Sequence, residues 1–83
     1  MGFLDALRGK PDVKRLKERS DVEGLVRALS HKDWTVRSGA AETLGELRDQ
    51  RAVTSLIKAL DDNVGRVCDE VVRSLGMIKD PSS

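Results

Sequence analysis

The sequence predicts an all-α fold, in which two αα-hairpin repeats stack into a short α-α superhelix behind an N-terminal capping segment. The first observation is an internal repeat: residues 22–29 and 53–60 place apolar side chains at the same positions, thirty-one residues apart. A period of about 20 to 50 residues is typical of stacked repeats, whose units bury their apolar faces against one another. The second observation is that apolar residues within each unit recur at intervals of three and four, which favours helices over strands.

Length and composition restrict the possible functions. The chain has 83 residues and a formal net charge of +1, which argues against binding to nucleic acid or to an acidic membrane. Residues 1–20 are more basic than the rest, which is more typical of a solvated face than of a site for an acidic partner. The single cysteine cannot form an internal disulfide. We expect a cytoplasmic chain, because there is no secretory pattern and no apolar run long enough to span a membrane.

Residues 1–20 are expected to cap the N-terminal end of the stack. A first apolar cluster at helical spacing suits covering an open core better than anchoring a membrane, and it consists of Phe3, Leu4 and Leu7. A second helical stretch follows over residues 11–19. Its apolar stripe is narrow, with only Val13 and Leu16, and its outer face is expected to stay in water.

The first repeat is predicted over residues 21–49. Asp21 is expected to cap its first helix, and the buried positions of that helix are Val22, Leu25, Val26 and Leu29. Asp33 is expected to cap the second helix, whose buried stripe is Val36, Ala40, Leu44 and Leu47. A short polar loop joins these helices, so they should lie antiparallel.

The second repeat is predicted over residues 50–83. Its first helix has the apolar residues Ala52, Val53, Leu56, Ile57 and Leu60. Asn63 is the expected N-cap of its second helix, and Pro81 is expected to end that helix. The second helix carries the stripe Val64, Val67, Val71, Leu75 and Ile78.

A longer sequence pattern runs through both repeats. It reads Asp-Trp-Thr-Val-Arg over residues 33–37, Ala-Ala-Glu-Thr-Leu-Gly-Glu-Leu over 40–47 and Asp-Gln-Arg-Ala-Val over 49–53, and it ends with Leu-Ile and Ala-Leu over residues 56–60. This pattern resembles the HEAT-like repeat of the phycobilisome-lyase type. The resemblance extends over residues 21–81. It implies an armadillo/HEAT-type solenoid that binds other macromolecules. The implied roles are a protein-binding scaffold or an accessory subunit of a lyase-type or other enzyme that donates no catalytic group.

The resemblance also implies that the second helices line the working surface of the superhelix. The outward positions expected to contact a protein partner are Trp34, Thr35, Ser38, Glu42, Arg66, Asp69, Glu70, Arg73 and Met77. Trp34 is either a binding hot spot or a side chain packed between the repeats, and the second interpretation is favoured. Arg37 is expected to pair with Asp33 or with the adjacent repeat, and so to act structurally before it contacts any ligand.

The second repeat departs from the pattern at its outer edge. Val64 replaces the aspartate, Cys68 replaces the arginine and Val72 replaces an alanine of the first repeat. A candidate self-association edge is therefore formed by Cys68, Val72 and Leu75. We expect either that another molecule covers this edge, in a symmetric homodimer through the last helix, or that the chain was cut from something longer.

No catalytic constellation is found in the sequence. His31 is the only histidine and Cys68 the only cysteine, and they belong to different repeats. This predicts no closed zinc site, no Cys-His nucleophile and no cofactor, so the chain is not expected to be an enzyme. Cys68 is interpreted as a small packed hydrophobe. Phe3 and Trp34 are the only aromatic residues, too few for a base-stacking surface that would bind nucleic acid.

Overall fold

The computed structural model describes residues 12–79, and these residues form helices with no strand. In chain order the elements are α2 (Val13–Glu18), α3 (Val22–Ala28), α4 (Trp34–Leu47), the 3-10 turn η1 (Gln50–Ala52), α5 (Val53–Lys58), the 3-10 turn η2 (Ala59–Asp61) and α6 (Gly65–Lys79). The predicted all-α class is confirmed. The expectations for Phe3, Leu4, Leu7 and Pro81 lie outside the described residues.

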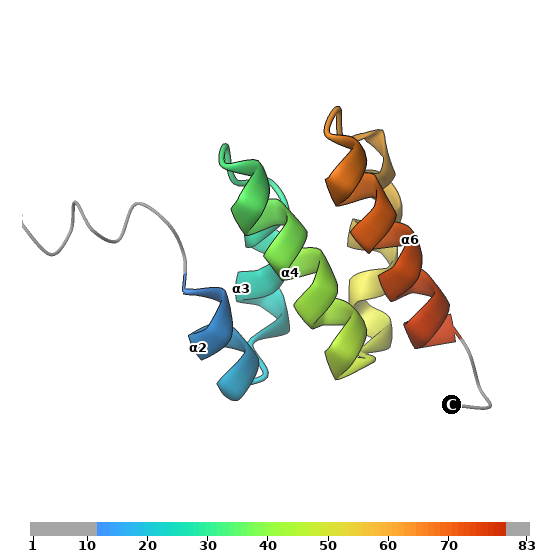
Figure 1. Ribbon diagram of the computed structural model, residues 1–83. Helices are drawn as coiled ribbons and strands as arrows, with labels where there is room; N and C mark the ends of the chain where they lie inside the picture. Colours follow the sequence, from blue (N-terminus) through green and yellow to red (C-terminus); the bar gives the residue numbers. More distant parts are fainter. Residues whose placement is uncertain (1–11, 80–83) are drawn as a thin grey trace, which may run out of the picture.

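The helices form two antiparallel hairpins that stack side by side. Helix α3 pairs with α4 and α5 pairs with α6, while the two long helices α4 and α6 run parallel as neighbours (Figure 1). The α4–α6 contact is the most extensive among the described helices. Helix α2 packs against both α3 and α4, so it covers the N-terminal side of the first hairpin.

Aspartate side chains begin the first three of these helices. Asp12 accepts a hydrogen bond from Arg15 N at 3.1 Å, and Asp21 accepts one from Gly24 N at 2.9 Å. Asp33 accepts one from Thr35 N, also at 2.9 Å. Each bond satisfies an amide of the first turn that has no partner within the helix. The predicted caps Asp21 and Asp33 are therefore confirmed.

The start of α6 differs from the prediction. The carbonyl of Val64 accepts the first helical bonds, from Val67 N and Cys68 N, so Val64 and not Asn63 precedes the helix. The side chain that organises this loop is Asp62, whose Oδ1 accepts from Val64 N at 2.9 Å. The expected cap at Asn63 is wrong because Val64 occupies the N-cap position, where its apolar side chain accepts no hydrogen bond, and Asp62 instead holds the N–H of Val64.

The core follows most of the predicted stripes and also contains two polar residues, Thr43 and Ser74. Leu25, Leu44, Leu56, Val67 and Val71 are fully buried. Val26, Leu47, Val64 and Leu75, which the stripes included, are only partly buried. Ser74, which the apolar pattern did not include, is also buried, and its Oγ donates to the carbonyl of Ala41.

Gly45 permits the close contact between α4 and α6. A Cβ atom at this position would lie 2.6 Å from Ser74 Oγ and 2.8 Å from Ser74 Cα. These separations are shorter than any van der Waals contact, so only glycine lets the backbone of α6 approach this closely. The group that a larger side chain at this position would meet is Ser74.

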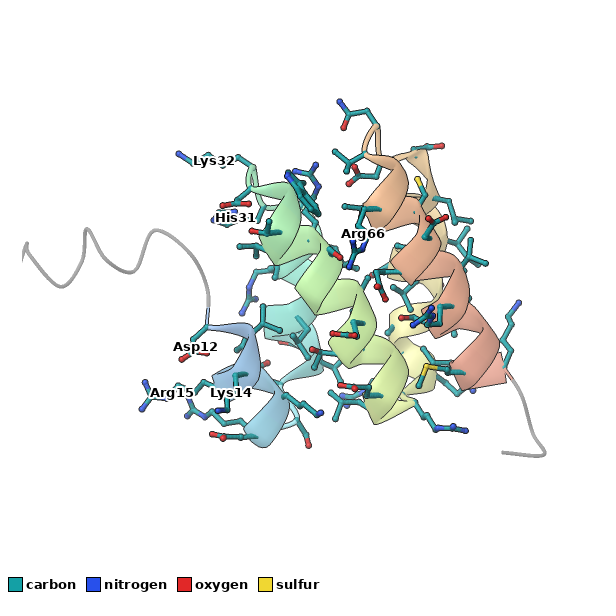
Figure 2. All side chains as sticks on the ribbon, in the orientation of Figure 1. Asp12, Lys14, Arg15, His31, Lys32 and Arg66 are labelled. Carbon is teal, nitrogen blue, oxygen red and sulfur yellow. The ribbon has the colours of Figure 1, made fainter. Side chains whose placement is uncertain are left out.

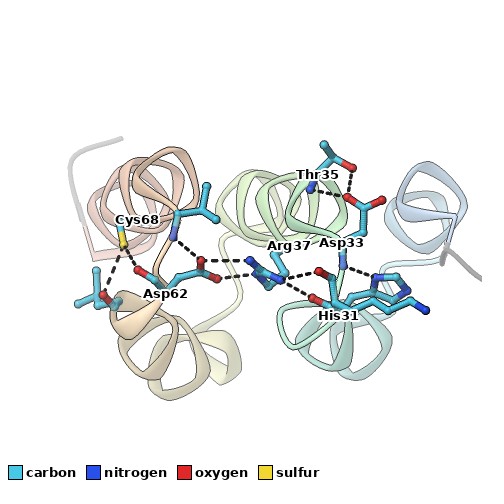
Figure 3. Close-up of polar contacts among 9 residues, drawn as sticks. His31, Asp33, Thr35, Arg37, Asp62 and Cys68 are labelled. Carbon is cyan, nitrogen blue, oxygen red and sulfur yellow. Dashed lines mark hydrogen bonds and ion pairs between the residues drawn. The ribbon is translucent and has the colours of Figure 1, made fainter.

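A charged pair joins the two repeats at the opposite end of α4. Arg37 Nε lies 2.6 Å from Asp62 Oδ2, and Arg37 Nη2 lies 3.3 Å from Asp62 Oδ1 (Figure 3). Arg37 Nη1 also donates to the carbonyls of His31 and Lys32, at 2.7 and 3.1 Å. Of the two expected partners for Arg37, the adjacent repeat provides the observed one, while Asp33 instead accepts from the Thr35 hydroxyl at 2.6 Å.

Cys68 takes the place of Arg37 in the second repeat. Its Sγ lies 3.4 Å from the Leu60 carbonyl and 3.1 Å from the Asp62 carbonyl (Figure 3). The Asp62 carbonyl corresponds by the thirty-one-residue period to the His31 carbonyl that Arg37 binds. The thiol is half-buried and hydrogen-bonded, so it closes the loop before α6 and is more than the apolar filler that the sequence suggested.

Candidate functional site

The outward surface of α4 and α6 collects the residues predicted to bind a partner. We call this surface the second-helix face; its members on the two helices are Trp34, Thr35, Ser38, Glu42, Arg66, Asp69, Glu70, Arg73 and Met77. Because α4 and α6 run parallel and in contact, the two sets of side chains lie side by side (Figure 2). Most of them are exposed, while Ser38, Glu70 and Met77 are half-buried.

The charges on this face alternate in sign over short distances. Glu42 is exposed on α4, while Arg66, Asp69 and Arg73 are exposed on α6. Such a mixture suits a surface of another protein with complementary charges, since a nucleic acid would require a field of one sign.

Arg66 and Glu70 occupy the seam between α4 and α6. Arg66 lies between the two helices (Figure 2), and its Nε is 4.0 Å from Glu70 Oε2. The Glu70 side chain is 14% exposed, and its Oε1 is buried with no hydrogen-bond partner among the described residues. A buried carboxylate oxygen without a donor is costly to the fold. The group of this pair that a partner can reach is the guanidinium of Arg66, whose side chain is 68% exposed.

Helix α2 extends the second-helix face by one further ion pair. Lys17 Nζ lies 2.9 Å from Glu46 Oε1 of α4, and both side chains are well exposed. The hydrogen bond with Glu46, followed by the Glu46 charge, raises the pKa of Lys17 above its ordinary value. The pair is open to solvent, so it adds to the charge pattern of the surface more than to stability.

Trp34 stands at the first turn of α4 and is 42% exposed. This exposure does not support the favoured interpretation, in which the ring packs between the repeats. A large aromatic side chain that is available at the surface suits a binding contact.

A groove between α3 and α5 was not anticipated from the sequence. One part has a volume of about 380 Å³ and is lined by Val22, Glu23, Val26, Arg27, Arg51 and Ser55. A second part of about 290 Å³ shares Val26 and Ser55 and is lined further by Leu29, Ser30, Lys58 and Ala59. The groove arises because α4 and α6 pack closely while α3 and α5 stand apart, and no local sequence signal reports that difference.

The described part of the chain was also searched for clusters of metal-binding side chains and for helices that could span a membrane. Within residues 12–79, no three His, Cys, Asp or Glu side chains come together in a way that could hold a metal ion. No helix in this part of the chain is long and apolar enough to cross a membrane.

The stacked hairpins, with their aligned second helices and inter-repeat Arg–Asp pair, define an α-α superhelical repeat protein. The chain matches HEAT repeats over residues 22–83, which is most of its length, and it belongs to this family. No match was found among curated proteins or among solved structures. HEAT repeats are in general protein–protein interaction modules.

Proposed function

We propose that this chain is a non-enzymatic protein-interaction module that holds its partner on the second-helix face. The observation that carries the proposal is the exposed set of charges of both signs along α4 and α6, namely Glu42, Arg66, Asp69 and Arg73. Charged groups arranged in this way select a partner by electrostatic complementarity and penalise partners with the wrong pattern. Trp34 at the edge of the face adds an apolar anchor.

Two finer statements belong to the same proposal. Within HEAT repeats, we place the chain with the phycobilisome-lyase type, because Asp33, Trp34 and Arg37 stand at the positions where that type carries them. An accessory role beside an enzyme would use the same face. The two roles differ in one measurable property: an accessory subunit changes the activity of the enzyme that it binds, whereas a scaffold does not.

The test compares two double variants that change the same amount of charge on different surfaces. Arg66→Glu with Arg73→Glu reverses the second-helix face, and Arg27→Glu with Lys58→Glu reverses the α3–α5 side as the control. Proteins retained by the immobilised wild-type chain are identified by mass spectrometry, and their affinities for all three chains are measured by calorimetry. We expect the face variant to lose about tenfold or more in affinity, because buried charge pairs at an interface each contribute on that scale.

The control variant should bind the same partner within a factor of about two, since it changes only charges remote from the contact. Circular dichroism establishes that both variants keep the helical content of the wild type. A partner that is lost by the control variant and retained by the face variant would refute the proposal and assign binding to the α3–α5 groove.

A further inference from the structure

Three of the four large hydrophobic residues exposed within residues 12–79 lie on one side of the second repeat. Ile57, Leu60 and Val72 are 48%, 40% and 59% exposed. We call the surface that they form the C-terminal edge; its other members on α6 are Cys68, Leu75 and Gly76. An apolar cluster of this kind on a small domain commonly marks a site of association.

The residues of the C-terminal edge can be compared with their equivalents in the first repeat. The first-repeat residues that correspond to Leu60, Val72 and Leu75 are Leu29, Ala41 and Leu44. All three first-repeat residues are buried, because the second repeat packs on them. The C-terminal edge is thus the stacking surface of a repeat, with nothing stacked on it among the described residues.

Gly76 provides a second, independent sign of an unfilled contact. It corresponds to Gly45, where the backbone of α6 approaches so closely that a Cβ would clash with Ser74. A Cβ at Gly76 would meet nothing within 4 Å. Glycine in a helix interior costs about 1 kcal/mol relative to alanine. No neighbour in the described part of the chain explains why glycine stands at this position. A closely packed helix from another molecule would explain it, as α6 does for Gly45.

We infer that the C-terminal edge binds the same edge of a second copy of this chain, in a two-fold symmetric dimer with the two α6 helices antiparallel. Stacking of copies head to tail is disfavoured because α2 covers the other end of the stack. Val13 of α2 lies 3.8 Å from where a Gly39 Cβ would be, and Leu16 lies 2.9 Å from where a Gly24 Cβ would be. An edge that meets its own copy closes after two subunits.

The charges beside the edge select the antiparallel arrangement. Asp61 lies just before α6, at the N-terminal end of the edge, whereas Lys79 is the last residue of α6, and both are exposed. An antiparallel pair brings the acidic end of one copy beside the basic end of the other. Pairing with like ends together would place carboxylates against carboxylates, which is unfavourable.

Val72, the most exposed of these apolar residues, lies at the middle of the α6 part of the edge, so the two-fold axis is expected to pass close to it. Cys68 then lies four residues from the axis in each copy, which separates the two thiols by about 12 Å along the helices. The dimer therefore requires no disulfide. This inference does not depend on the proposed function, because the C-terminal edge and the second-helix face are different surfaces.

The first experiment is sedimentation equilibrium from low-micromolar to submillimolar concentration. We expect the wild-type mass to rise from 9.1 kDa toward twice that value. Val72→Glu should raise the dimer Kd more than about tenfold, because it buries an unpaired charge at the axis. Ser30→Glu adds the same charge at an exposed position of the first repeat, outside both the C-terminal edge and the second-helix face, and should dimerise like the wild type. Ile57→Lys is a second edge variant with the same expectation as Val72→Glu.

The arrangement of the helices is tested by chemical cross-linking with a short bismaleimide in a Cys68→Ser background. Val72→Cys should give a covalent dimer in high yield, and Thr35→Cys should give little. A wild type that remains monomeric throughout, or a Val72→Glu chain that dimerises as tightly as the wild type, would overturn the inference. Efficient cross-linking at Thr35→Cys with none at Val72→Cys would overturn it equally.

Discussion

Substitution by alanine should lower the stability of the fold at Gly45 and raise it at Gly76, although the two glycines occupy equivalent positions in the two repeats. At Gly45, an added Cβ would lie 2.6, 2.7 and 2.8 Å from Oγ, Cβ and Cα of Ser74. Since Cα is a backbone atom, α6 must shift as a whole, and overpacking of this kind costs about 1–3 kcal/mol. The shift also weakens the hydrogen bond from Ser74 to Ala41, at about 1 kcal/mol. The better helix propensity of alanine returns about 1 kcal/mol.

The expected result for Gly45→Ala is therefore a net loss of about 1–3 kcal/mol in the free energy of unfolding. That is a large fraction of the total for a domain of this size, which is about 4–12 kcal/mol. At Gly76 a Cβ meets nothing within 4 Å, so Gly76→Ala keeps only the propensity gain and should stabilise by up to about 1 kcal/mol.

The assay is urea unfolding followed by circular dichroism at 222 nm, where helices give a strong negative signal. Both variants are made in the Val72→Glu background, so that dimer formation does not contribute to the measured stability. If Gly45→Ala proved as stable as its parent, or if both variants shifted in the same direction, the close approach of α6 to Gly45 would be refuted.

Two further predictions concern the charged pairs. Asp62→Asn should destabilise the fold by about 2–3 kcal/mol, because it leaves the largely buried Arg37 without its counter-charge, whereas Asp61→Asn on the exposed neighbour should be nearly neutral. Burial opposes ionisation of Asp62, but the hydrogen bonds that its carboxylate accepts and the Arg37 charge outweigh burial and lower its pKa. The stability due to this pair is therefore present above the ordinary aspartate pKa of about 3.9 and is lost as the pH falls through the lower native value, which urea unfolding at several pH values will show. The hydrogen bonds from Arg51 lower the pKa of Asp49 to about 2. In the Arg51→Ala variant, an NMR titration of Asp49 should find a pKa closer to the ordinary aspartate range. An unchanged pKa would contradict the pairing of the two side chains.

Much of the fold was predictable because the deciding interactions are local. The caps Asp21 and Asp33 bond to amides two or three residues away, and the apolar spacing of three and four specifies which face of each helix is buried. The thirty-one-residue period then places equivalent residues in equivalent helices. The outward positions of the second-helix face could be named in advance for the same reason, although what they bind stays a prediction.

The sequence by itself determined the helical class, the two-hairpin register and the residues that face outward on α4 and α6. Only the tertiary structure decided which groups meet across the repeats: Arg37 with Asp62, Ser74 against Gly45, and Cys68 with the loop carbonyls. It also decided that Trp34 is exposed. These outcomes depend on the distance and angle between hairpins. Those quantities are set by the combined packing of side chains far apart in the chain, which no local pattern contains.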